Sequence, residues 1–180
     1  MSKPYHPFSN RAGNTLKWGL VAILLFAIVN YWTNERRKLE RQLSAMAGAI
    51  SHHGSTLSPA WLNGLSSSIH DNCSLETTTV NVEGILNEAL SQAQIIEGVT
   101  QVASISTDFD VRLEQVTVDV YRDTKRAQVN ADAIIEVAHD GRFDREKRHV
   151  TITMKNVGSQ YRLVSVEASS PITSQPEPRP

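Results

Sequence analysis

Three histidines and the single cysteine are the side chains of this chain best suited to bind a metal ion. His52 and His53 are adjacent, and two residues separate His70 from Cys73. Imidazole nitrogens and thiolates are zinc ligands, so His70 and Cys73 would supply two ligands and the histidine pair a third. Adjacent histidines rarely bind one ion well, however, and nothing in the sequence fixes these segments relative to each other. We therefore predict no metal site and no cofactor, with His52, His70 and Cys73 as the residues to examine.

A charged segment, Asp140–His149, offers a different kind of chemistry, which is contact with another protein. It places one aromatic residue among several arginines, and these residue types carry much of the binding energy at interfaces. We predict that Arg142, Phe143, Arg145 and Arg148 bind a partner. The alternative is an ordinary turn that its charges keep soluble. The sequence has no Gly-rich phosphate loop, no Gly-x-Ser-x-Gly elbow and no His-Glu-x-x-His motif, which favours binding over catalysis.

An uncharged run extends from Trp18 to Asn34. As a helix it would span about 25 Å, slightly less than the ~30 Å hydrocarbon core of a bilayer. Trp18 at one end, and Tyr31 and Trp32 at the other, suit the two headgroup layers. No small-residue cleavage site follows closely, so the pattern predicts an uncleaved single-pass anchor behind a polar tail (1–17), rather than a signal peptide.

Orientation in the membrane is not decided by charge. Lysines and arginines are nearly balanced on the two sides of the apolar run, so the positive-inside rule favours neither orientation. We expect a cell-membrane protein with its C-terminal domain on the extracytoplasmic side.

An amphipathic stalk helix is predicted over residues 35–53. Leu39, Leu43, Met46 and Ile50 follow one another at spacings of four, three and four, which is the seam of a short coiled coil. One interpretation is a homodimer through these four residues. The other is a helix that packs on the chain's own domain or on the lipid surface.

Residues 54–80 are rich in Ser, Thr, Asn and Gly and predict a linker. One short helix is expected inside it, because Ser58 is a good N-cap and Pro59 suits the first helical position. The segment from Ser66 to Thr79 predicts a loop.

An α+β domain is predicted over residues 81–169, with a disordered proline-rich tail (170–180) behind it. A helix is expected over Val82–Glu97, ended by Gly98. After Thr107 the hydrophobic period changes to two, and short turns separate the segments, which predicts an antiparallel meander whose apolar face the helix covers. The alternating rows are Val116, Val118 and Val120; Val129, Ala131, Ala133, Ile135 and Val137; Val150, Ile152 and Met154; and the strand Tyr161–Ala168.

The segment Val150–Glu167, VTITMKNVGSQYRLVSVE, resembles the end of nuclear-transport-factor-2-like domains, also called cystatin-like or ketosteroid-isomerase-like domains. Tyr161 takes the aromatic place between the Gly-containing turn and the last strand. The resemblance implies helices followed by a long curled sheet. In enzymes of this superfamily a Tyr and an Asp inside the concave face act as oxyanion donor and general base, which makes Tyr121 and Asp132 the candidates here. The apolar rows, however, predict that both side chains lie on the solvated outer face.

The balance of charge excludes a typical nucleic-acid binder, because 18 basic residues face 19 acidic ones. A membrane anchor followed by such a domain also resembles scaffold subunits of bacterial secretion machines and anchored accessory proteins of lipid-import systems. We therefore predict a non-enzymatic, membrane-anchored module that assembles a cell-envelope complex through protein–protein contact. The alternative is a small-ligand-binding protein or isomerase-like enzyme that uses a pocket between helix and sheet.

Overall fold

The structure is a computed structural model, and it describes residues 35–54 and 56–172. The predicted anchor, Trp18–Asn34, and most of the predicted tail lie outside the described residues. Within the described part of the chain, no helix is both long and apolar enough to cross a bilayer.

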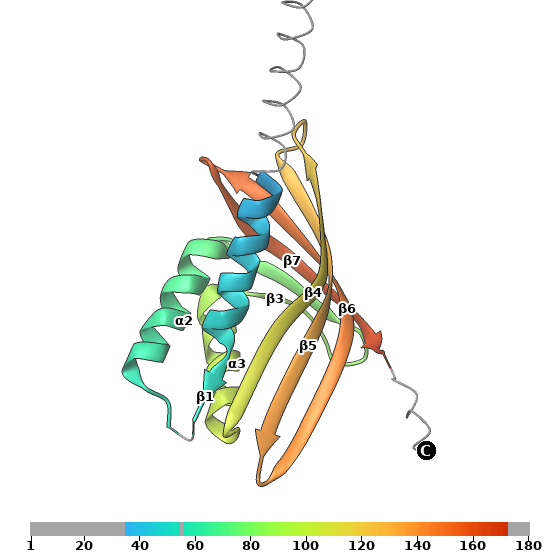
Figure 1. The fold of residues 1–180 in the computed structure, drawn as a ribbon. Coiled ribbons are helices and arrows are strands. Elements are labelled where there is room, and N and C mark those ends of the chain that lie inside the picture. The colour runs from blue at the N-terminus through green and yellow to red at the C-terminus, as the bar shows by residue number, and fades with distance from the viewer. Residues whose placement is uncertain (1–34, 55, 173–180) are drawn as a thin grey trace, which may run out of the picture. The chain divides into compact units, whose positions relative to one another are not determined.

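Three helices cover one face of the sheet (Figure 1). The N-terminal helix occupies residues 35–50, α2 runs from Pro59 to Asn72 and α3 from Gln92 to Ile105. Ser58 starts α2 as predicted, because its side chain accepts the backbone N–H of Trp61 and Pro59 follows it.

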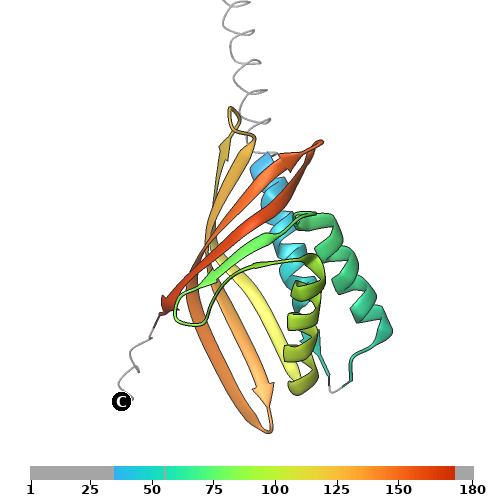
Figure 2. The same ribbon diagram turned by 180° about the vertical axis from the view of Figure 1, so that it is seen from behind.

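The sheet has the strand order β1-β4-β5-β6-β7-β2-β3. The strands are β1 (His52–His53), β2 (Thr78–Val82), β3 (Leu86–Leu90), β4 (Asp108–Tyr121), β5 (Arg126–His139), β6 (Arg142–Val157) and β7 (Gln160–Pro171). Strands β4 to β7 form the predicted antiparallel meander. The expectation of a purely antiparallel sheet is wrong, because β2 pairs with β7 in parallel (Figure 2). Strand β7 also extends to Pro171, into the predicted tail.

A β-bulge in β4 keeps apolar side chains on the helix side along the whole strand. The pairing with β5 shifts between Glu114 and Thr117, and Gln115 has a positive φ of 52°. Before the bulge Leu113 faces the helices, and after it Val118 does. The apolar residues stand at odd positions before the bulge and at even positions after it. The extra residue in the bulge keeps both sets on the same face of the sheet.

The apolar side of the N-terminal helix packs into the domain core. Leu39 is fully buried, Leu43 and Met46 are nearly so, and all three join one cluster with Leu65 of α2 and Met154 of β6. Of the two interpretations of this seam, the described residues show the helix packed on its own domain.

The domain boundary expected at residue 81 is therefore wrong. The predicted stalk (35–53) and linker (54–80) belong, from Lys38 onward, to the compact unit that also contains the sheet, because their apolar side chains cover its inner face. A homodimer through the same seam would require the helix to leave the sheet.

The helix predicted over Val82–Glu97 is also wrong. Strand β2, a turn at Gly84 (φ 77°) and β3 occupy most of it. The helix α3 begins ten residues later, because Ser91 and Gln94 form a capping box. Gly98 lies inside α3 instead of ending it, and α2 continues through the first half of the predicted loop, to Asn72.

Candidate functional site

A cleft of about 440 Å³ lies between the N-terminal helix and the inner face of the sheet. The helix contributes Leu43, Met46, Ala47 and Ile50 to its lining. The β2–β3 turn contributes Ile85, and strands β4 to β7 contribute a floor that includes Leu113, Ile135, Ile152 and Leu163. All of these side chains are aliphatic or thioether, so the cleft suits an apolar molecule.

One ion pair lies among these apolar side chains. Glu146 and Arg148 are the charged residues of the lining, and they are two positions apart on β6, so both point to the inner face. The guanidinium Nε of Arg148 pairs with Oε1 of Glu146. Arg148 is only 6% exposed, whereas the Glu146 side chain is 41% exposed.

Backbone carbonyls also hold the buried Arg148 in place. Nη1 of Arg148 donates to the carbonyl of Ser169 at 2.9 Å and to that of Glu83 at 3.4 Å. Glu83 begins the β2–β3 turn, and its carboxylate accepts the backbone N–H of Ser170 at 2.8 Å. The hydrogen bonding with Ser170 lowers the pKa of Glu83. The arginine therefore links β6, the end of β7 and the lip that carries Ile85, which is 70% exposed.

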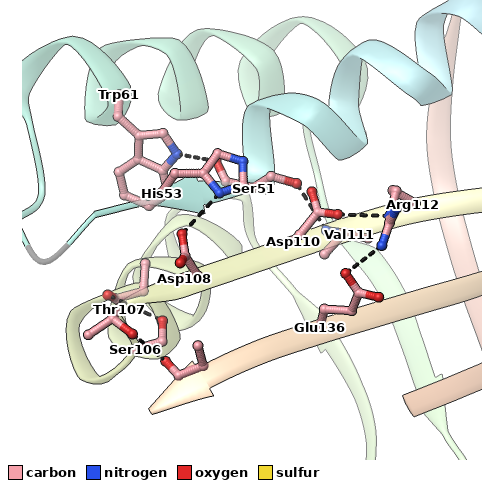
Figure 3. Close-up of polar contacts among 12 residues, drawn as sticks. Ser51, His53, Trp61, Ser106, Thr107, Asp108, Asp110, Val111, Arg112 and Glu136 are labelled. Carbon is pink, nitrogen blue, oxygen red and sulfur yellow. Dashed lines mark hydrogen bonds and ion pairs between the residues drawn. The ribbon is translucent and has the colours of Figure 1, made fainter. Parts of the chain in front are cut away.

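Ser51 connects the end of the N-terminal helix to strand β4. Its hydroxyl donates to the carbonyl of Ala47 at 2.9 Å and accepts the backbone N–H of Val111 at 3.0 Å. The indole N–H of Trp61 in α2 donates to the carbonyl of Ser51 at 2.8 Å (Figure 3). Because Ala47 and Val111 both line the cleft, these bonds set the spacing between helix and sheet.

The outer face of the sheet carries a network of opposite charges. Arg112 pairs with Asp110 at 2.8 Å and also with Glu136 (Figure 3). Ile134, which is 2% exposed, lies directly between Arg112 and Lys147 in the register of the strands. The aliphatic stems of these long side chains can cover Ile134 while their charges stay hydrated.

The two predicted catalytic candidates lie on this outer face and not in the cleft. Tyr121 is 46% exposed at the end of β4. Asp132 accepts from Lys147 at 2.9 Å and pairs with His149 at 3.2 Å. These two contacts, with Lys147 the stronger, lower the pKa of Asp132. A general base in an apolar cleft would have a raised pKa instead.

The predicted contact residues separate into two groups. Arg142, Phe143 and Arg145 are exposed near the β5–β6 turn, and Phe143 is 64% exposed. Arg145 pairs with Glu136 at 3.4 Å. Arg148 is not part of this surface, because its even position on β6 turns it into the cleft.

The three predicted metal-ligand candidates do not come together. His52 is buried in β1, with its ring 4.8 Å from that of Trp61. His70 is exposed on α2, and Cys73 is buried just after that helix. Burial raises the pKa of the Cys73 thiol to about 11, against the smaller lowering effects of Arg162 and Thr78. Among the described residues, no group of three potential ligands could hold a metal ion.

Comparisons with known proteins identify the fold. No family model and no curated protein sequence matches this sequence. Solved structures do match it, among them an NTF2-like protein with a cystatin-like fold from Novosphingobium aromaticivorans, with 13% identity and a TM-score of 0.60 over 84% of this chain and 90% of that one. The fold is that of nuclear-transport-factor-2-like proteins.

Two further NTF2-like structures agree. An NTF2-like superfamily protein from Salmonella enterica has a TM-score of 0.61 at 11% identity and covers 82% of this chain and 98% of that one. A candidate dehydratase of the NTF2-like family from Streptomyces avermitilis has a TM-score of 0.60 at 13% identity, over 79% of this chain and 99% of that one. The NTF2-like fold expected from the Val150–Glu167 segment is thus confirmed. Identities this low establish the fold and not the activity.

The ion pair of the cleft was missed at the sequence level, although one signal for it was present. Glu146 and Arg148 share the even positions of β6 with Val150, Ile152 and Met154. The same alternation that assigned the apolar row to the inner face therefore assigns these two charges to it. A pocket between helix and sheet was the alternative expectation, with the helix expected over Val82–Glu97. In the structure the N-terminal helix lines the cleft instead.

Proposed function

We propose that this domain binds a small apolar molecule in the cleft between the N-terminal helix and the sheet. The observation that carries the proposal is the lining, which is apolar except for Glu146 and Arg148. A volume of about 440 Å³ is typical of small-molecule sites, which measure roughly 300–1,000 Å³. Similar structures that include a candidate dehydratase also favour a small-molecule function.

An isomerase-like reaction on the bound molecule is a narrower form of this proposal. Glu146 is the carboxylate of the cleft lining, so a proton transfer from the ligand would use Glu146 and not Asp132. No other described lining residue offers a carboxylate or imidazole.

Blocking the cleft tests the proposal. Ala168 lines the cleft, whereas Glu167, the next residue on β7, is exposed. We expect Ala168→Trp to abolish binding of a neutral apolar probe, decanol, and Glu167→Trp to leave it unchanged. Binding would be measured by equilibrium dialysis of the full chain in nanodiscs of zwitterionic phospholipid, with empty nanodiscs as the blank. Equal decanol binding by both variants, or the absence of saturable binding of both decanol and decanoate by the unsubstituted chain, would overturn the proposal.

We propose further that the Trp18–Asn34 run anchors the chain in the cell membrane, with the domain on the extracytoplasmic side. The uncharged run with aromatic residues at both ends supports the anchor. The intact mass of the protein from membrane fractions should correspond to a chain that retains this run. In intact cells, added protease should remove the domain. A mature N-terminus beyond residue 34 would contradict the anchor, and protection from protease would contradict the orientation.

The second candidate function is assembly of an envelope complex through the exposed residues of the β5–β6 hairpin. Phe143 favours it, because a 64% exposed aromatic side chain beside Arg142 and Arg145 has the composition of an interface anchor. Replacing Phe143 and Arg145 with Ala should reduce recovery of membrane partners in a pull-down at unchanged stability. The control is the outer-face pair Tyr121→Phe and Asp132→Asn. Unchanged recovery with the hairpin variant excludes this function.

A further inference from the structure

We propose that the apolar ligand is a monocarboxylic acid whose carboxylate binds Arg148 and displaces Glu146. The inference rests on the proposed ligand-binding function of the cleft and names the chemical class of the ligand. Its basis is the placement of a buried arginine, with a replaceable partner, at one end of an apolar cleft.

Arg148 is the fixed member of the ion pair. It is 6% exposed, and the carbonyls of Ser169 and Glu83 hold its Nη1 from two other segments of the chain. These contacts and the Glu146 pair use Nε and Nη1. Among the described residues, none accepts a hydrogen bond from Nη2 of Arg148. The N–H groups of Nη2 can therefore donate to an oxygen of a ligand.

Glu146 is the replaceable member. Its side chain is 41% exposed, against 7% for that of Arg148. Arg148 is its single ion-pair partner among the described residues. Rotation of Glu146 toward water would rehydrate its carboxylate, whereas Arg148 would be left as an uncompensated buried charge unless another anion replaced it.

This asymmetry selects the head group of the ligand. A carboxylate reproduces the charge and the two-oxygen geometry of Glu146, and guanidinium–carboxylate pairs are among the strong hydrogen-bonded pairs. A neutral apolar molecule cannot replace Glu146, so it would bind with the internal pair intact and gain only apolar burial. The tail of the acid would extend along Ile152 and Leu163 toward Leu43 and Met46, which line the rest of the cleft.

The other charge near the head-group position is Glu83. Its carboxylate accepts the backbone N–H of Ser170 and lies close enough to Arg148 to feel its charge. With Glu146 also in place, the carboxylate of the ligand would be a third negative charge beside one guanidinium. Displacement or neutralisation of Glu146 should therefore strengthen acid binding, and this expectation separates the proposal from a purely structural ion pair.

Decanoate and decanol form a matched pair of probes, because they differ only in the head group. In equilibrium dialysis with the full chain in zwitterionic nanodiscs, we expect decanoate to bind about tenfold more tightly than decanol, or ~1.4 kcal/mol. Glu146→Gln should increase decanoate affinity severalfold and leave decanol unchanged. Arg148→Met should reduce decanoate affinity to the decanol level. Arg126→Met, at the exposed start of β5, is the control and should change neither.

A second variant protects the test from misfolding. Arg148→Met alone leaves Glu146 unpaired, so the double variant Arg148→Met/Glu146→Gln removes both charges and should fold while binding decanoate and decanol equally. Equal binding of the two probes by the unsubstituted chain, or acid preference that survives in the double variant, overturns this inference alone. If neither probe binds, the proposed function itself is wrong.

Discussion

Gln42 of the N-terminal helix donates to the carbonyl of Tyr161 at 2.7 Å and to the side-chain oxygen of Asn72 at 2.8 Å. Gln42 and Tyr161 are 119 positions apart in the sequence. One side chain thus joins the helix to the beginning of β7 and to the end of α2. This contact, together with the buried seam below it, makes the helix an integral part of the domain.

The first prediction concerns truncation. A fragment beginning at Lys38 should be soluble and unfold cooperatively, whereas one beginning at Gly54 should not. The shorter fragment lacks Leu39, Leu43 and Met46, and burial of each such side chain stabilises a core by about 2–5 kcal/mol. Their combined loss is comparable with a whole domain's stability of about 5–15 kcal/mol. Urea unfolding followed by circular dichroism distinguishes the two fragments, and a cooperative transition for residues 54–180 would refute the prediction.

The second prediction tests the seam itself. Leu39→Ala should lower the free energy of unfolding by about 2–5 kcal/mol, because Leu39 is completely buried. The exposed neighbour gives the control, Glu40→Ala, which should change stability by less than about 0.5 kcal/mol. The effect of Leu39→Ala should not depend on protein concentration. A loss of stability that grows on dilution would instead support a homodimer through this seam.

The third prediction follows from the lowered pKa of Asp132. Because the folded state binds this proton less readily than the unfolded chain, the stability from Asp132 is fully present above its unfolded pKa, ~3.9. It is lost as pH falls through the lower folded pKa. The difference in unfolding free energy between the unsubstituted chain and Asp132→Asn should therefore shrink between about pH 5 and pH 2. Asp123→Asn in the β4–β5 turn is the comparison, and a constant difference for Asp132→Asn contradicts the expectation.

The fourth prediction concerns Cys73. Its thiol is 2% exposed and has a pKa raised to about 11, so the reactive thiolate is scarce near pH 8. Alkylation of the folded chain should be far slower than that of the urea-unfolded chain. In an Asn63→Cys variant, one thiol on the exposed side of α2 should react rapidly and the other should remain protected. Rapid modification of two thiols in that variant would show that Cys73 is accessible.

The meander could be predicted because its signals are local. Apolar and polar residues alternate over residues 126–133 of β5 and 149–155 of β6. The Asp140–Gly141 and Gly158–Ser159 turns have the positive φ angles that such short connections require. Alternation also placed Tyr121 and Asp132 correctly on the outer face. A further local signal indicates the bulge in β4. The apolar residues of this strand change from odd to even positions between Leu113 and Val116.

The β2–β3 hairpin, the start of α3 and the β2–β7 pairing could not be predicted in the same way. Local signals compete in this part of the sequence, or the structure depends on contacts between distant residues. The apolar residues of Val82–Glu97 suggested a helix, but Gly84 permits the β2–β3 turn, and the Ser91–Gln94 capping box provides a better helix start. The parallel pairing of β2 with β7 joins segments about 85 residues apart, which no local pattern specifies. The expected pocket between helix and sheet was assigned to the wrong helix for the same reason, since the N-terminal helix and the strands that line the cleft are far apart in the sequence.

The parallel β2–β7 pair also has a consequence for biosynthesis. The N-terminal helix and β2 are made early, but β7, against which both are held, is made last. At about 5–20 residues per second, the ribosome needs about 6–24 s to proceed from the end of that helix to the end of β7. During this interval the helix has no completed sheet to cover its apolar side. Such long-range closure makes folding slow and leaves this apolar side uncovered until β7 has been made.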